Sequence, residues 1–246
     1  GDQSQMEMVG FAHYCADPTM RQALREGKDL HRMTAVEAGI ATDEASCTPD
    51  QRKLGKGSNF AVVYGCGGAK LASFLSQDLY AGREVTPAEA AEIRSKYHRR
   101  FPGVGAFTQR VVQTIRQRAD FSVTNMFGRR MHLPPVFDKK RNRLAEKAYV
   151  GPNRLVQSWA ADAMKRSMVR VWRYARQNDL RIYLNVHDEL KTHCLEKNWV
   201  EHARELERLL AECPGLSVPI RVELTFSRTN WADEEVVHNY EIPARA

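Results

Sequence analysis

The chain has 246 residues, of which 43% are hydrophobic, so it is long and apolar enough for one large domain or two small ones. No run of about 18 apolar residues occurs, which excludes a transmembrane helix, and the polar first residues are not expected to be a signal peptide. The formal net charge of +7 fits nucleic-acid binding, but also a solvated basic face. Five widely spaced cysteines without a CxxC pair favour a reducing compartment, without a disulfide framework or a zinc site.

The first half of the chain is expected to be mainly helical. Residues 1–8 are predicted to begin it as a strand. Two helices then start with a Thr followed by Pro, and with Gln or Glu three residues after the Thr, which is a helix-capping pattern. These helices cover 48–64 and 86–100. A further helix is expected over 104–118, and FSVTNM and RMHL are expected to pair in a hairpin around Phe127-Gly128.

The second half alternates helices with strands. The predicted elements are a long helix over 142–177 that Gly151-Pro152 kinks or breaks, strands over 181–187 and 189–195, a helix over 198–212 and a strand over 219–226. This is an α+β layout. The strands from both ends of the chain could share one antiparallel sheet, with the helices forming a separate lobe. In such a sheet Asp2 and Asp188 could meet.

The stretch LNVHDELKTH, residues 184–193, alternates like a half-buried strand and then places His187, Asp188 and Glu189 side by side. Neighbouring acids raise each other's pKa unless a positive charge lies nearby. One interpretation is a polar turn between strands, with Asp2 a frayed terminus. The other is a metal site that Asp2 completes. Two Mg²⁺ ions about 3.5–4 Å apart, held by carboxylates and substrate phosphates, can activate a 3′-hydroxyl and stabilise a leaving pyrophosphate.

The helix that starts at Pro49 carries a second pattern. Arg52, Lys56 and Phe60 are spaced i, i+4, i+8 and form one stripe, which Tyr64 continues. Two cations followed by a ring suit a nucleoside triphosphate, because the charges can bind the phosphates and the ring can contact the sugar or base. The alternative is a basic solvated face that runs into a buried aromatic side chain.

Other polar and small residues admit two interpretations each. Gly55 and Gly57 each destabilise the helix by roughly 1 kcal/mol relative to Ala, which indicates a helix that moves or is approached closely. His31 could donate a hydrogen bond to a phosphate or be structural. Asn153 and Gln157, at i and i+4, could read minor-groove acceptors or cap the nearby kink.

Taken together, these stretches resemble a known family. GDQSQMEM is similar to motif A of the family A DNA polymerases (bacterial DNA polymerase I and its phage relatives), QRKLGKGSNFAVVYG to their motif B, and VHDEL to motif C. GKDLHRMTA, FGRRMHLP and NRLVQSWAAD also match in order. The resemblance therefore covers nearly the whole chain, and three motifs in the right order are strongly specific.

The resemblance implies a right-hand polymerase fold, with an antiparallel palm sheet and a helical fingers lobe. It implies template-directed DNA synthesis from dNTPs with two Mg²⁺ ions, for which Mn²⁺ could substitute. The metal ligands would be Asp2, Asp188 and the backbone carbonyl of Gln3, with Glu189 as an accessory acid. The triphosphate would be bound by Arg52, Lys56 and His31, and Lys56 could protonate the pyrophosphate.

The remaining roles concern the sugar, the base and the primer–template. Glu7 would be the steric gate against a ribose 2′-hydroxyl, Phe60 would disfavour dideoxynucleotides, and Tyr64 would stack near the templating position. The primer–template contacts would come from Gln5, Asn153, Gln157 and His187.

The sequence also departs from the family pattern. Gln3 stands where Tyr is usual, and Ala61 stands where Gly is usual. The segment AEKAYVGPNRLVQ is two residues longer than the common pattern, so Lys147 is only the nearest candidate for the family's DNA-contacting Arg. The Gly-Cys turn at 65–66 and the longer tail after Trp231 favour a phage relative over a bacterial one.

The resemblance also predicts the domain organisation. Residues 1–25 would be the palm strand and the start of the fingers, 26–120 the fingers, and 121–246 the palm with the motif C hairpin. The family's thumb and exonuclease-type domains precede motif A and are absent from this chain. We therefore expect a C-terminal polymerase portion that an upstream fragment or chain completes.

The expected partners are primer–template DNA and a dNTP, with no membrane, in the cytoplasm or in a host's cytoplasm for a phage protein. Two alternatives stay open at this point. One is a single-subunit RNA polymerase, against which Glu7 argues. The other is a non-catalytic nucleic-acid-binding module derived from a polymerase, against which the retained Asp2, Asp188, Arg52 and Lys56 argue.

Overall fold

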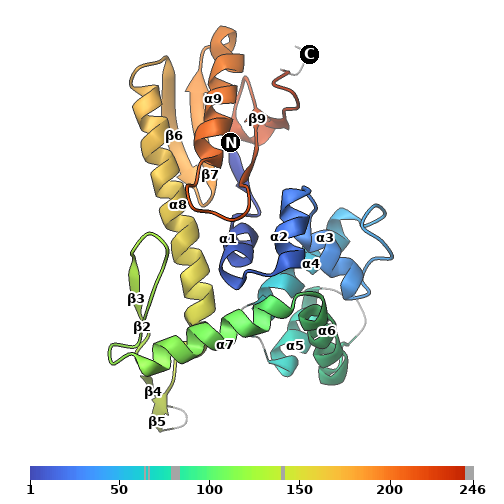
Figure 1. The fold of residues 1–246 in the computed structure, drawn as a ribbon. Coiled ribbons are helices and arrows are strands. Elements are labelled where there is room, and N and C mark those ends of the chain that lie inside the picture. Colours follow the sequence, from blue (N-terminus) through green and yellow to red (C-terminus); the bar gives the residue numbers. More distant parts are fainter. Residues whose placement is uncertain (64, 66, 79–83, 140–141, 242–246) are drawn as a thin grey trace. The chain divides into compact units, whose positions relative to one another are not determined.

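The computed structural model describes residues 1–63, 65, 67–78, 84–139 and 142–241 (Figure 1). The chain divides into two compact units. Unit 1 comprises Gly1–Gly10 and Ser158–Ala246, and unit 2 comprises Phe11–Gln157. Within the described ranges, no helix combines the length and the apolar character that crossing a membrane requires.

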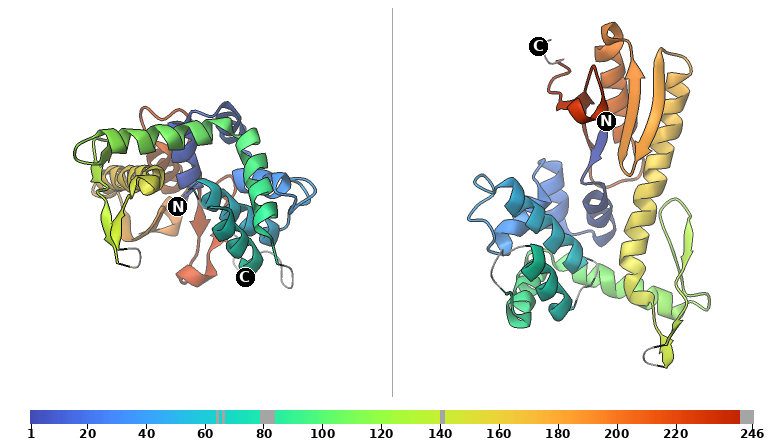
Figure 2. Two further views of the ribbon diagram at one scale, coloured as in Figure 1. Left: turned by 90° about the horizontal axis from the view of Figure 1, so that it is seen from below. Right: turned by 180° about the vertical axis from the view of Figure 1, so that it is seen from behind.

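Unit 1 is built on a four-stranded antiparallel sheet with the strand order β6-β7-β1-β8. The strands are β1 (Asp2–Ser4), β6 (Leu180–Val186), β7 (Glu189–Cys194) and β8 (Arg221–Glu223). The first strand of the chain thus lies between strands from its C-terminal part, which confirms the predicted shared sheet and the α+β class. Figures 1 and 2 show these strands beside the helices that carry their core.

The core of unit 1 lies on one face of this sheet. Leu190 of β7 is fully buried against side chains from α8 (Gly151–Ala175) and α9 (Trp199–Ala211). The cluster contains Met164, Val171, Leu180, Leu190, Leu206, Leu209 and Leu210. Successive side chains of a strand point to opposite faces, so the neighbours of Leu190 point away from these helices.

Unit 2 is mainly helical. Its helices are α2 (Pro18–Arg25), α3 (Leu30–Glu37), α4 (Pro49–Val63), α5 (Gly68–Asp78), α6 (Pro87–Arg100) and α7 (Pro102–Gln117), and α1 (Met6–Cys15) leads into it from unit 1. Two hairpins follow, β2 (Ser122–Thr124) with β3 (Arg130–His132) and β4 (Val136–Asp138) with β5 (Arg143–Ala145). The first of them is the predicted hairpin.

Both predicted capping boxes are confirmed. The Gln51 backbone N–H donates to Thr48 Oγ1 over 3.2 Å, and the Thr48 N–H donates to Gln51 Oε1 over 2.8 Å. Thr86 and Glu89 make the same reciprocal pair at the start of α6. Each box satisfies two backbone donors that a helix N-terminus would otherwise leave unpaired.

Three predicted element boundaries were wrong. Residues 1–8 are not one strand, because Gln5 takes a positive φ of 53° that ends β1 and lets α1 begin at Met6. The long helix does not begin at 142. That region forms β5 and a 3-10 turn, and α8 starts at Gly151 with Pro152 in its first turn, where the missing N–H costs no hydrogen bond.

The predicted strand over 219–226 is also divided. β8 ends at Glu223, and β9 (Thr225–Phe226) pairs with β10 (Glu235–Val236) instead of with β1. Between them the Leu224 carbonyl accepts from the backbone N–H of Val237 over 2.8 Å. The segment that follows Glu223 is therefore bonded to the C-terminal tail and not to the main sheet.

Candidate active site

The two-residue turn between β6 and β7 consists of His187 and Asp188. His187 takes a positive φ of 55°, which is costly for a residue with a side chain. The Asn185 side-chain amide donates to the backbone carbonyls of His187, over 3.3 Å, and Glu189, over 3.0 Å. Sequence reasoning missed Asn185, although an amide two residues before a turn is a known turn-stabilising pattern. Its two bonds hold the tip that presents Asp188.

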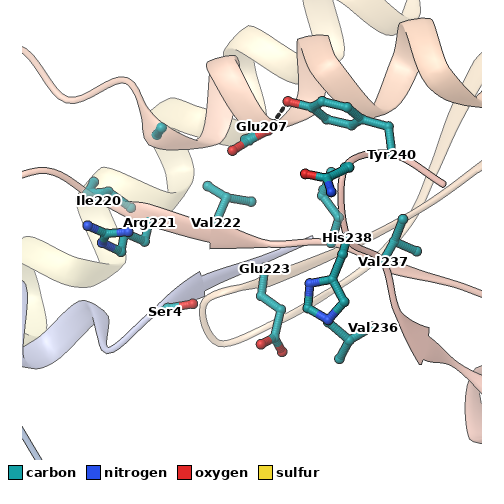
Figure 3. A pocket seen from close by; sticks show the side chains of 13 residues that line it. Ser4, Glu207, Ile220, Arg221, Val222, Glu223, Val236, Val237, His238 and Tyr240 are labelled. Carbon is teal, nitrogen blue, oxygen red and sulfur yellow. Dashed lines mark hydrogen bonds between the residues drawn. The ribbon is translucent and has the colours of Figure 1, made fainter. Parts of the chain in front are cut away.

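Three carboxylates form one row across the sheet. Asp2 of β1 lies directly opposite Glu189 of β7 on one side and opposite Glu223 of β8 on the other. Figure 3 shows Glu223 pointing from β8 away from Glu207 of α9. We call Glu189, Asp2 and Glu223 the acid row. Like charges directly opposite each other destabilise a sheet, so this arrangement is costly unless a cation offsets it.

Asp188 adds a fourth acid at the end of this row. The Gln3 backbone N–H donates to the Asp188 carbonyl over 2.9 Å, so the hairpin tip is bonded to β1. Burial, together with the charges of Asp188, Glu189 and Glu223, raises the pKa of Asp2 to about 6. The predicted meeting of Asp2 and Asp188 on one sheet is thus present in the structure.

Glu223 was not among the residues that the sequence singled out. Its signal is the alternation in RVEL, which places Val222 toward the core and its acidic neighbour on the opposite face. Alternation alone does not say which strand lies next to it. The register with Asp2 comes only from the folded sheet.

Gln3, Gln5 and Glu7 follow Asp2 in unit 1. The Gln3 side chain is fully buried and donates to the Leu210 carbonyl over 2.7 Å and to Ser167 Oγ over 3.2 Å, so only its backbone faces the acids. Gln5 Oε1 is buried and has no hydrogen-bond partner in the described part of the chain. Glu7 is half-buried in the first turn of α1.

The donor set suits a hard divalent cation. No three His, Cys, Asp or Glu side chains of the described ranges converge to hold a metal by themselves. Mg²⁺, however, is typically held by one or two carboxylates and completes its shell with water and substrate phosphates. Asp2 and Asp188 supply two such carboxylates. The pKa of Asp2 is raised chiefly by burial and then by its acidic neighbours, and a cation would offset the charge of those neighbours.

The predicted triphosphate residues cluster in unit 2, on α3 and α4. Arg52 forms an ion pair with Asp29, Nε to Oδ2 at 2.5 Å, and Asp29 also caps α3 by accepting from the His31 N–H over 2.8 Å. Lys56 Nζ lies 6.0 Å from the centre of the Phe60 ring, and that ring lies 5.8 Å from the His31 ring. Phe60 therefore lies between Lys56 and His31, and Arg52 is connected to His31 through Asp29.

His31 is buried between these helices. Its pKa is lowered to about 4, chiefly by burial; the charge of Asp29 opposes this shift, and the charges of Arg52 and Lys56 add to it. Asn59 donates to the Leu30 carbonyl over 3.0 Å, lies 3.2 Å from His31 Nδ1, and accepts from the Tyr97 hydroxyl over 2.8 Å. His31 is thus a neutral ring within a buried polar network.

The two glycines of α4 allow close approach. A Cβ on Gly55 would stand 2.1 Å from the His31 carbonyl oxygen, and a Cβ on Gly57 would stand 2.1 Å from the tip of the Phe74 ring. Both distances are far below van der Waals contact. Of the two interpretations of these glycines, close approach is the one that the structure supports.

The remaining predicted site residues lie elsewhere or outside the described part. Asn153 and Gln157 lie in the first turns of α8 within unit 2, where Gln157 is exposed and Asn153 Oδ1 is buried without a partner among the described residues. Lys147 precedes the short 3-10 turn Ala148–Val150. Tyr64 lies outside the described residues.

A cavity of about 530 Å³ lies beside β8 in unit 1 (Figure 3). Ser4 and Glu223 line it, together with His238 and Tyr240 of the C-terminal tail. Tyr240 donates to Glu207 there. Asp2 and Asp188 are not among its lining residues, so of the four acids described above only Glu223 borders this cavity.

Comparison with known proteins gives the family. Residues 1–233 match the family model for DNA polymerase family A, so the chain belongs to that family. It is similar to DNA polymerase I of Pseudomonas aeruginosa, with 33% identity over 236 residues that cover 94% of this chain and 24% of that protein. It is also similar to DNA polymerase I of Bacillus caldotenax, with 29% identity over 234 residues, 94% of this chain and 25% of that protein.

Solved structures agree. The chain resembles the POL domain of Pol1 from M. smegmatis, in a complex with DNA primer-template and dNTP, with a TM-score of 0.77 and 28% identity. The match covers 89% of this chain and 37% of that one. The chain thus spans about a quarter of the length of the curated relatives that it matches.

Proposed function

We propose that this chain carries out template-directed DNA synthesis, transferring dNMP from a dNTP to a primer 3′-hydroxyl, in DNA replication. The observation that carries the proposal is the sheet register that brings Asp2 beside the motif C hairpin with Asp188. Membership of DNA polymerase family A supports it. The related Pol1 domain was solved with the ligands that such a reaction uses, a primer-template and a dNTP.

Asp2, Asp188 and the Gln3 carbonyl would hold the divalent ions, with Glu189 as the accessory acid. Two Mg²⁺ ions, when bound, supply activation of the 3′-hydroxyl and stabilisation of the leaving pyrophosphate. The chain's own contribution is to hold these oxygens on a rigid sheet, with the hairpin tip fixed by Asn185. A rigid frame matters because small displacements at such sites are costly.

Residues of unit 2 would bind the incoming nucleotide. Arg52 and Lys56 would pair with the triphosphate, and Lys56 would donate a proton to the departing pyrophosphate. His31 would contribute a neutral hydrogen-bonding ring, which its burial favours. Phe60 and Tyr64 would contact the sugar and the templating position, and Glu7 of unit 1 would exclude a ribose 2′-hydroxyl. Contacts to the primer–template would come from Gln5, Asn153, Gln157 and His187.

The domain assignment belongs to the same proposal. Residues 1–25 would open the palm and lead into the fingers, 26–120 would be the fingers, and 121–246 the palm with the motif C hairpin. The proposed partners are primer–template DNA, a dNTP and an upstream polymerase portion with the thumb. Action in the cytoplasm and a phage relationship stay predictions.

Primer extension with dNTPs tests the proposal directly. We expect extension with Mg²⁺ or Mn²⁺, none with EDTA, and none with Asp188→Asn. The matched control is Asp179→Asn, which removes an exposed carboxylate at the other end of the same hairpin and should extend normally. If the chain alone fails, an upstream polymerase half is added. Failure in its presence too, with primer–template binding retained, would support a non-catalytic binding module instead.

The preference for dNTPs over rNTPs distinguishes a DNA polymerase from a single-subunit RNA polymerase. Glu7→Ala should admit ribonucleotides that the unaltered chain rejects, because removal of the side chain opens space for a 2′-hydroxyl. Unchanged selectivity would remove Glu7 from the gate role.

A further inference from the structure

A lysine on β7 connects the acid row to the C-terminal tail. Lys191 lies two residues after Glu189, so both side chains point to the same face of the strand, and they form an ion pair. The Lys191 ammonium also pairs with Glu234 in the tail. Its Nζ lies 4.8 Å from the centre of the Trp231 ring. One cation is therefore held by two carboxylates and one indole.

This cluster differs from an ordinary surface ion pair. The side chain of Lys191 is only 13% exposed, and those of Glu189 and Glu234 are 18% and 21% exposed. Exposed pairs contribute little because water screens them and both side chains stay mobile. A lysine whose side chain is largely covered and has three partners has lost most of its freedom, so it can fix the position of the carboxylate that it holds.

The tail segment that supplies the partners is itself well held. β9 and β10 pair as a short hairpin, with Glu235 opposite Phe226. Thr225 Oγ1 donates to Glu234 Oε2 over 3.0 Å. Asn230 caps the short 3-10 turn Trp231–Asp233 by accepting from the Ala232 N–H over 2.8 Å. Backbone pairing and side-chain bonds thus fix Glu234 before it meets the lysine.

We propose that Lys191 is a positioning residue that fixes the Glu189 carboxylate in the acid row, with the tail segment Thr225–Val236 as its support. The contact chain runs from the β9–β10 hairpin through Glu234 to Lys191 and from there to Glu189. The catalytic consequence rests on the proposed function, in which Glu189 is the accessory acid. The structural claim, that Lys191 holds Glu189, stands apart from it.

Kinetics test the catalytic consequence. Lys191→Met keeps the length of the side chain and removes its charge. It should lower kcat for nucleotide addition on the order of tenfold, as misplaced catalytic groups do, and leave KM for the dNTP nearly unchanged. Lys191→Arg should restore most of the rate. Glu234→Gln should lower kcat by less, because Lys191 keeps its other two partners.

Two comparisons separate positioning from general loss of structure. In a Glu189→Gln background, Lys191→Met should have no further effect on kcat, because its target is already altered. Arg208→Met is the matched control. Arg208 also bridges two carboxylates, Glu205 and Glu212, but does so on the exposed face of α9. It should extend primers like the unaltered chain.

Stability gives a readout that needs no activity. Urea unfolding followed by tryptophan fluorescence reports on unit 1, because Trp159, Trp172, Trp199 and Trp231 all lie there. Lys191→Met and Glu189→Gln together should lower the midpoint by less than the sum of their single effects. Additive shifts would overturn the proposal, as would wild-type kcat in Lys191→Met. If the unaltered chain extends no primer under any condition, the proposed function fails, and the unfolding cycle still decides whether Lys191 holds Glu189.

Discussion

Protonation of His31 should make the stability of unit 2 depend on pH. The ring is buried beside Asn59, and its pKa is lowered from 6.5 to about 4, chiefly by burial. Above pH 6.5 the ring is neutral in the folded and the unfolded chain. Between about pH 6.5 and 4 the unfolded chain binds a proton that the folded chain excludes, so stability falls as the pH falls. Below about pH 4 both states are protonated, and the loss is complete.

The size of the effect follows from the two pKa values. A pKa lowered from 6.5 to about 4 corresponds to about 3 kcal/mol of unfolding free energy, of which roughly 2 kcal/mol is lost between pH 7 and pH 4.5. Although burial acts the other way, the hydrogen bond and charge of Arg52 lower the pKa of Asp29, so Asp29 also loses stability as the pH falls and the pH dependence of the whole chain is larger. Comparison with a His31 variant isolates the share of this one ring.

The assay is urea unfolding at several pH values, followed by circular dichroism at 222 nm. Unit 2 contains no tryptophan, so tryptophan fluorescence does not report on it, and circular dichroism follows its helices together with those of unit 1. His31→Gln should lose less stability between pH 7 and pH 4.5 than the unaltered chain, by roughly 2 kcal/mol. His193→Gln, at an exposed histidine of β7, is the control and should follow the unaltered chain. Equal pH slopes for the unaltered chain and His31→Gln would refute a buried neutral ring.

Two further outcomes follow from packing and burial. Gly55→Ala should lower the free energy of unfolding by about 2 kcal/mol or more, measured by thermal unfolding, because its Cβ would meet the His31 backbone. Gly57→Ala should lower it by less, because the Phe74 ring can turn away. Equal losses for the two variants would contradict this. Burial raises the pKa of the Cys15 thiol to about 11, so iodoacetamide at pH 8 should leave it unmodified in the folded chain and alkylate it in urea. Labelling of the native thiol, read by mass spectrometry, would contradict that burial.

Local signals in the sequence predicted much of the fold. Thr48 and Thr86 mark two helix starts because capping depends on residues only three positions apart. The hairpin around His187 follows from alternation on both sides of a polar pair. The α+β layout indicated that the first strand could share a sheet with this hairpin, but alternation does not specify the register that places Asp2 opposite Glu189.

The features that were missed depend on distant contacts. Gln5 ends β1 through a positive φ that no local residue preference favours, since Gly is the usual choice there. The end of strand β8 at Glu223 depends on the C-terminal tail, because the backbone N–H of Val237 donates to the Leu224 carbonyl. In the sequence, Lys191 is one more polar residue of an alternating strand. Its ion pair with Glu234 of the tail is visible only in the folded structure. Each of these features depends on a contact with a segment that is distant in the sequence. The residues nearby do not specify that contact.

The acid row shows how register and charge constrain each other in unit 1. Leu190 must enter the core, so Glu189 must face the other way, and the same alternation turns Asp2 outward beside it because Gln3 is buried. A slip of one residue would bury the acids and expose Leu190, which makes the register hard to lose. The opposed carboxylates are therefore tolerated because the shifted register would destabilise the sheet more than their repulsion does. Lys191 offsets part of that repulsion at the Glu189 end of the row. The other end, at Glu223, is exposed to water, which screens its charge. Asp2 lies between them, half-buried, and there a bound cation would lower the repulsion most.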